Sequence, residues 1–119
     1  MEEPECDFDE TSKAGYVRVR MRIPGIKPGR GGSKPEKGNA EFEGPFYGNE
    51  NISITLKILD KGGLDNCNYQ YQVNHLPGAI VPEKTKITVK KDWVHMFMKK
   101  KNKDKSWESN FRNGSLEAE

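Results

Sequence analysis

The sequence predicts an all-β protein, a compact antiparallel β-sandwich of about seven strands, with a long Gly- and Pro-rich loop and disordered termini. Apolar and polar residues alternate along several short segments, and Gly- or Pro-containing turns separate these segments. No segment longer than a turn has helical spacing. Short strands joined by turns are typical of an antiparallel sandwich, and the 119 residues leave room for one domain.

The alternation is strictest over residues 17–23, where apolar side chains alternate with Arg18, Arg20 and Arg22. This pattern predicts a strand with one apolar face. A Pro-Gly pair follows and ends the strand, because proline lacks an amide hydrogen and glycine tolerates turn geometry.

Four further segments predict strands. Residues 52–59 and 69–74 alternate in the same way around a turn rich in Gly, Asp and Asn, which predicts a β-hairpin. Residues 86–90 and 93–100 predict a second pair of strands around a short turn, and 41–47 predicts a weaker strand.

We expect the segment before residue 86 to be irregular, with Ile80 and Val81 filling one end of the core.

The remaining segments divide the chain. Residues 1–14, with six acidic side chains among the first ten, predict an acidic disordered tail. Residues 24–40 hold five glycines and three prolines, which predicts a flexible inserted loop. The sandwich domain is therefore placed at residues 15–108, with Trp107 covering the core, and a C-terminal tail at 109–119.

Charge and cysteine content restrict the class of protein. The chain has 20 basic and 18 acidic residues, and this balance makes a nucleic-acid partner a poor expectation. No segment has the roughly 20 apolar residues of a membrane span, and the acidic N-terminus does not resemble a secretory signal. Cys6 and Cys67 are too few for a disulfide framework. We expect free thiols in a reducing compartment, the cytoplasm or the nucleus.

No arrangement of residues predicts a catalytic centre, a metal site or a cofactor. The two histidines, His75 and His95, fall on different predicted strands, and the cysteines and histidines lack the short spacings of a zinc site. The Gly-rich loop lacks the residue order of a phosphate-binding loop, and no helix follows it. We therefore expect a protein that is not an enzyme.

The first candidate binding feature is the row of Arg18, Arg20 and Arg22. Alternate residues of a strand project from one face about 7 Å apart. Such a row suits an acidic protein partner through charge complementarity. Alternatively, the charges keep an edge strand from pairing with other sheets.

The second candidate binding feature is formed by Trp93, His95 and Phe97, which alternate with the apolar residues of the last strand. Large aromatic side chains on an outward face are typical of binding hot spots. Alternatively, the acidic tail, the loop at 24–40 or the C-terminal segment covers these rings. Together the two features predict a partner-binding site for another protein.

A run of motifs in the second half of the chain supports the same role. An Ile-Val-Pro-Glu-Lys segment at Ile80–Lys84 is followed by a short strand at Lys86–Lys90. An alternating strand that ends in Lys-Lys comes next, at Val94–Lys100, and then Trp107. This order resembles the CS domain, a module of co-chaperones, over about residues 15–108.

The resemblance implies a seven-stranded antiparallel sandwich. It also implies a co-chaperone or scaffold, linked to the ninety-kilodalton heat-shock chaperone or to ubiquitin-ligase complexes. Two positions used for chaperone contact in the family hold Arg22 and Trp93 here, so the resemblance does not carry that contact over residue by residue.

The alternative function is a nucleic-acid-binding module. It would use the basic loop at 24–40 and five clustered lysines, Lys99, Lys100, Lys101, Lys103 and Lys105.

Overall fold

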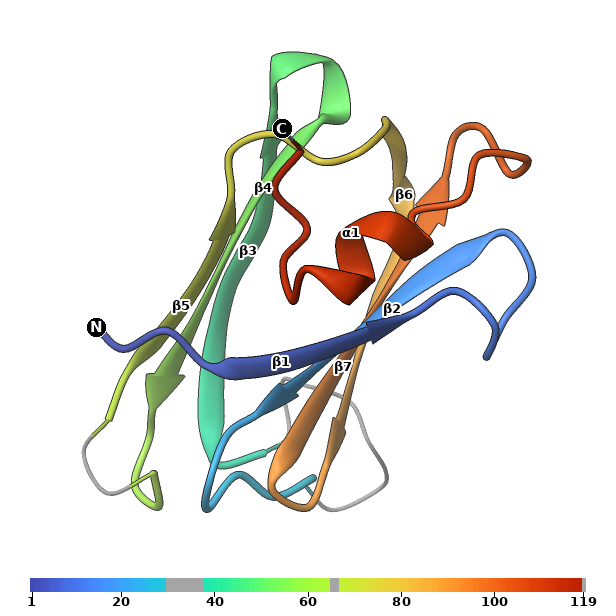
Figure 1. Ribbon diagram of the computed structural model, residues 1–119. Coiled ribbons are helices and arrows are strands. Elements are labelled where there is room, and N and C mark those ends of the chain that lie inside the picture. Colours follow the sequence, from blue (N-terminus) through green and yellow to red (C-terminus); the bar gives the residue numbers. More distant parts are fainter. Residues whose placement is uncertain (30–37, 65–66, 119) are drawn as a thin grey trace.

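Two antiparallel sheets face each other in the computed structural model, which describes residues 1–29, 38–64 and 67–118 (Figure 1). One sheet has the strand order β1-β2-β7-β6 and the other has the order β3-β4-β5. The elements are β1 (Glu5–Asp9), β2 (Tyr16–Arg22), β3 (Ala40–Gly48), the short turn η2 (Asn49–Asn51), β4 (Ser53–Asp60), β5 (Tyr69–Val73), β6 (Ile80–Lys90), β7 (Trp93–Lys100) and the helix α1 (Glu108–Arg112). The predicted all-β antiparallel sandwich is confirmed.

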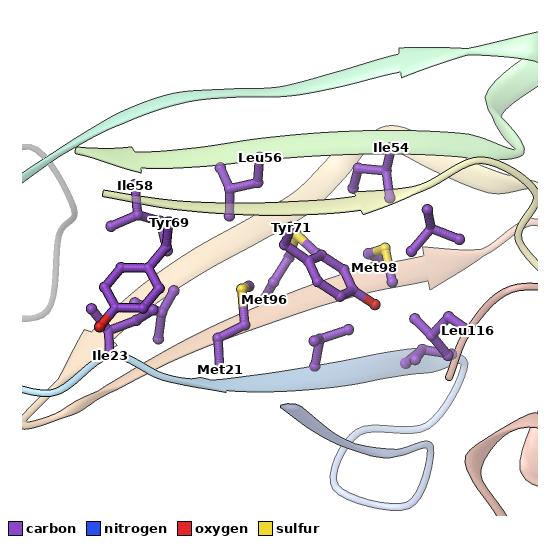
Figure 2. Packing of buried hydrophobic residues seen from close by; sticks show 14 of the residues in the cluster. Met21, Ile23, Ile54, Leu56, Ile58, Tyr69, Tyr71, Met96, Met98 and Leu116 are labelled. Atoms are coloured by element: carbon purple, nitrogen blue, oxygen red, sulfur yellow. The ribbon is translucent and has the colours of Figure 1, made fainter. Parts of the chain in front are cut away.

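Strand alternation builds the core between the two sheets. Every second side chain of β2, β4, β5 and β7 is buried, and Figure 2 shows Met21, Met96 and Met98 across from Leu56 and Tyr71. Trp107 is 1% exposed and closes one end of this core, as the sequence predicts. The apolar periodicity of the sequence is therefore the packing pattern of the fold.

The N-terminal segment is ordered, which corrects the disordered tail predicted for residues 1–14. Strand β1 pairs antiparallel with β2, and its Cys6 and Phe8 pack against the core. The backbone of Glu2 also forms a parallel bridge with β5 at Tyr69. Since the acidic residues of β1 project outward, a segment rich in charge still supplies an apolar face.

The C-terminal segment also packs, although 109–119 was predicted to be a tail. Leu116 is 1% exposed, and the ring of Phe111 stacks on Phe8 with centroids 6.0 Å apart. The amide of Ala118 donates to the carbonyl oxygen of His75 at 2.6 Å. In Figure 1 this segment, with α1, lies between β5 and β1.

Strand β6 begins at Ile80, earlier than the predicted strand at 86–90. Ile80 pairs with Lys100 and Val81 with Lys99, and the register then shifts before Lys86. The segment predicted to be irregular is therefore a strand with a bulge. Pro82 argued against a strand here, because proline is not found within central strands. β6 is an edge strand, and an edge strand can accommodate a proline.

The inserted loop begins with ordered residues. Ile26 is fully buried, and the Asp92 amide donates to its carbonyl oxygen at 2.9 Å. Gly25 has φ +89° and lies so close to Gly63 that a Cβ atom there would sit 2.2 Å from its carbonyl oxygen, which requires glycine. The rest of the predicted flexible loop, 30–37, lies outside the described residues.

No helix in the described residues is long and apolar enough to span a membrane.

Candidate protein-binding face

The outward side chains of the four-stranded sheet form rows that cross β1, β2, β7 and β6. Strand register sets these rows, because residues opposite each other in adjacent strands have neighbouring side chains on the same face. We call the following twelve residues the outer face: Glu5, Arg22, Trp93 and Lys90 in the first row, Asp7, Arg20, His95 and Thr88 in the second, and Asp9, Arg18, Phe97 and Lys86 in the third. All six residues predicted to bind a partner lie on this one face.

Two arginines of the row are paired within the chain. Nε and one terminal nitrogen of Arg20 each donate to an oxygen of Asp7 at 2.6 Å. Arg18 donates from Nε to Asp9 at 2.7 Å. The acidic partner that the sequence predicts for Arg18 and Arg20 is therefore, in the described structure, the protein's own strand β1.

These ion pairs contribute to shifts in the pKa values of Asp9 and Arg20. Burial alone would raise the pKa of Asp9, but hydrogen bonds from Ser12 and Arg18 outweigh it and hold this pKa below 3.8. The hydrogen bond to Asp7 raises the pKa of the Arg20 guanidinium above its usual range. Strand β1 thus neutralises one side of the outer face at neutral pH.

Trp93 lies among cations at the end of the sheet. The guanidinium carbon of Arg20 is 5.2 Å from the centroid of the Trp93 ring, and that of Arg22 is 5.6 Å away. Both distances fit cation–π contacts. The side chain of Trp93 is half-buried, as are those of His95 and Phe97, so the aromatic strip predicted to be outward is outward and only partly covered.

Three cations beside this strip have no carboxylate partner among the residues that the structure describes. Arg22 is exposed and lies over the ring of Trp93, and Lys86 and Lys90 are exposed on β6. Lys90 lies opposite Trp93, and Lys86 lies opposite Phe97. Each large ring therefore has an arginine on one side and a lysine on the other, which suits an acidic partner with apolar groups.

The position of His95 at the centre of this face lowers its pKa. Burial is the main cause, and the charges of Arg18, Arg20 and Lys90 act in the same direction against the smaller opposing effect of Asp7. The pKa of His95 therefore lies below 6.5. At neutral pH the middle of the face is an uncharged ring.

The sequence alone did not identify the two lysines of β6 and the aspartates of β1 as parts of this face. Alternation within each segment was visible, but which strands are neighbours was not. Lys86 and Lys90 face outward with the same two-residue period as Trp93 and Phe97. That period, once β6 and β7 are paired, is the signal that identifies them.

The alternative nucleic-acid-binding function depends on five clustered lysines, and two of them make contacts within the chain. Lys100 is 6% exposed and forms an ion pair with Glu10 at 3.0 Å. The ammonium of Lys105 donates to the carbonyl oxygen of Pro77. Two of the five cations therefore support the fold, which leaves Lys99, Lys101 and Lys103 for contacts with other molecules.

Within the described ranges, no group of three or more His, Cys, Asp or Glu side chains is placed to hold a metal ion. The thiol of Cys6 faces the interior, and its pKa is raised to about 12, first by burial and then by Glu3 and Asp7. Such a thiol is a poor nucleophile.

No model of a known protein family matches the chain, and no curated protein matches it. The resemblance to the CS domain therefore stays a prediction.

Proposed function

We propose that the protein is a non-catalytic protein-binding module, and that it binds an acidic segment of its partner on the β7 and β6 side of the outer face. One observation carries the proposal: the half-buried rings of Trp93 and Phe97 lie opposite Lys90 and Lys86, two lysines that have no carboxylate partner in the described part of the chain. Aromatic anchors with neighbouring charges are the usual composition of a binding hot spot.

The two halves of the outer face support this assignment. On the β1 side, Asp7 and Asp9 already occupy Arg20 and Arg18. On the β6 side, Lys86 and Lys90 point outward with no acidic residue in the adjacent rows of β7. A partner with negative charge is therefore attracted to the β6 side, where apolar rings can also be covered.

The particular role we propose is that of a co-chaperone or scaffold, with the ninety-kilodalton heat-shock chaperone as the first partner to test. This role follows from the CS-like motifs of the sequence. It agrees with the seven-stranded antiparallel sandwich, although a shared fold alone does not establish a function.

The test is a titration of the protein, labelled with 5-fluorotryptophan, with the purified chaperone. The chain has two tryptophans, so the fluorine spectrum reports separately on half-buried Trp93 and fully buried Trp107. We expect the Trp93 signal to shift on binding while the Trp107 signal stays. A Trp93→Ala variant should bind about thirtyfold more weakly, the loss typical of a hot-spot residue.

Charge-reversal variants complete the test. The double variant Lys86→Glu/Lys90→Glu should also lose affinity, whereas Lys61→Glu, an exposed lysine in the turn after β4, should not. If the chaperone binds all of these variants equally, the outer face is not its docking site. If the chaperone does not bind the unaltered protein, the chaperone assignment is wrong, and binding of acidic peptides then decides whether the face is a binding site.

A further inference from the structure

The pairing of β1 with β2 shows how this sheet recognises an acidic strand. Asp7 lies opposite Arg20 and Asp9 lies opposite Arg18 in the antiparallel register. Each carboxylate forms an ion pair with the arginine across from it, at 2.6 Å in both cases. Backbone pairing therefore sets the register, and cross-strand charge pairs select the sequence of the added strand.

The opposite edge of the same sheet offers the equivalent arrangement without a strand beside it. β6 is the last strand in the order β1-β2-β7-β6, and its other side has no paired strand among the described residues. An edge strand presents a row of amide and carbonyl groups that can pair with another chain. From residue 86 to 90 this edge also follows regular register with β7.

The outward side chains along this edge are Lys86, Thr88 and Lys90. The two lysines are four residues apart, which corresponds to about 13 Å along a strand. Both are exposed, and neither forms an ion pair with any residue that the structure includes. The edge therefore has the backbone groups and the charge, in a fixed spacing, to select an acidic strand.

We infer that the edge of β6 binds an extended acidic segment of a partner protein by strand addition. The segment carries carboxylates four residues apart, one opposite Lys86 and one opposite Lys90. This inference rests on the proposed function and specifies the chemistry and the conformation of the partner. The added strand would extend the sheet in the way that β1 extends it at the other edge.

Pairing of two β6 edges around Thr88 is disfavoured. Antiparallel pairing of two β6 strands around Thr88 would place Lys86 of each copy opposite Lys90 of the other. Like charges directly opposite each other destabilise a strand pair. The edge thus disfavours this self-pairing and favours an acidic strand.

The first test compares two peptides by NMR titration of the full protein at low salt. One is acetyl-Thr-Asp-Val-Thr-Val-Asp-Val-Thr-amide, whose carboxylates lie four residues apart on one face of a strand. The other is acetyl-Thr-Asp-Val-Thr-Asp-Val-Val-Thr-amide, which has the same composition but carboxylates on opposite faces. We expect the first peptide to bind about fivefold more tightly, the effect of one cross-strand charge pair. Its binding should shift the amide signals of residues 86–90.

The second test removes backbone hydrogen bonding without changing charge. In one version of the first peptide the three valine amides are N-methylated, and in another the two aspartate amides and the central threonine amide are N-methylated. Alternate amides of a strand point to opposite sides. Strand addition therefore predicts that one version loses binding and the other keeps it. Lys86→Glu/Lys90→Glu should reduce affinity for the unmodified peptide about tenfold or more, and Lys61→Glu should not.

The outcomes separate this inference from the proposed function. If both peptides bind equally, with no difference between the N-methylated versions, strand addition at β6 is overturned. A shift of the Trp93 signal by those same peptides would then still support the outer face as a binding site. If no peptide binds, the inference is overturned, and the chaperone titration alone decides the proposed function.

Discussion

Glu10 and Lys100, 90 positions apart in the chain, form an ion pair of 3.0 Å that joins the N-terminal segment to the end of β7. The Glu10 carboxylate also accepts hydrogen bonds from the Trp107 amide at 3.1 Å and from the Ser106 hydroxyl. Lys100 takes an inward position of β7, where it is 6% exposed. One carboxylate therefore joins the N-terminal segment to the end of β7 and to the residues that follow it.

The first prediction concerns this pair. Glu10→Ala should lower the free energy of unfolding by about 3 kcal/mol, because it leaves the buried ammonium of Lys100 without its carboxylate. Replacing both residues, in Glu10→Ala/Lys100→Met, should recover part of the loss, since no buried charge then remains. Urea unfolding of the four proteins in the double-mutant cycle measures both effects.

The matched control is the exposed pair of Arg112 and Glu108, whose atoms are 3.1 Å apart. Glu108→Ala should change stability by less than about 1 kcal/mol, as exposed ion pairs contribute little. Equal losses for Glu10→Ala and Glu108→Ala would contradict the assignment of a buried pair.

The second prediction concerns strand β1. Deletion of residues 1–9, which keeps Glu10, should lower the midpoint of urea unfolding strongly, because it removes a whole strand together with Phe8. Phe8→Ala alone should cost about 2 kcal/mol, less than a fully buried phenylalanine. Hydrogen exchange should show faster exchange of the β2 amides in the deletion variant. An unchanged midpoint would mean that residues 1–9 are the disordered tail that their acidic composition suggests.

The third prediction separates the two tryptophans. Trp107 is 1% exposed, whereas Trp93 is half-buried on the outer face. Trp107→Ala should therefore cost about 3–5 kcal/mol and leave little folded protein at 37 °C. Trp93→Ala should leave the domain folded with a much smaller loss. Thermal unfolding followed by far-ultraviolet circular dichroism checks both, and a greater loss for Trp93→Ala than for Trp107→Ala would contradict the burial.

The fourth prediction concerns pH. Burial, together with Arg18, Arg20 and Lys90, lowers the pKa of His95 below 6.5 in the folded protein. The unfolded chain then binds more protons than the folded one as the pH falls through this range, so His95 makes stability decline from about pH 7 downward. The decline stops once the pH is below the folded-state pKa. His95→Gln should remove this contribution, and Lys90→Met should raise the pKa of His95 towards 6.5.

An NMR titration of the His95 ring signals measures the pKa directly, and urea unfolding between pH 5 and 8 measures the stability. His75→Gln, at an exposed histidine after β5, is the control and should keep the contribution of His95. A His95 pKa above 6.5 in the folded protein would contradict the prediction.

The sequence was sufficient to predict the sandwich and the direction of most side chains. Val94, Met96 and Met98 are inward and Trp93, His95 and Phe97 are outward, because the two-residue period of a strand is a local property. The arginines of β2 were placed on the correct side for the same reason.

Two features could not be read from local pattern. From its composition, the acidic segment that contains Asp7 and Asp9 looks like a disordered tail. In the structure it is a strand, because the arginines of β2 lie opposite its aspartates. From the sequence, Lys100 looks like an exposed surface lysine. In the structure it is buried and forms an ion pair with Glu10, from the other end of the chain. Both depend on contacts between distant segments, which alternation within one segment does not encode.

The order of strands in the two sheets has a kinetic consequence. β3, β4 and β5 are consecutive neighbours that need only short loops to close, whereas β2 pairs with β7, and Arg22 lies opposite Trp93. Closing such a long loop costs conformational entropy before the contacts between the two strands can offset that cost. The three-stranded sheet can therefore form early, whereas the four-stranded sheet forms only when β2 and β7, which are far apart in the sequence, come together. A chain that ends before β7 would leave β2 paired with β1 alone.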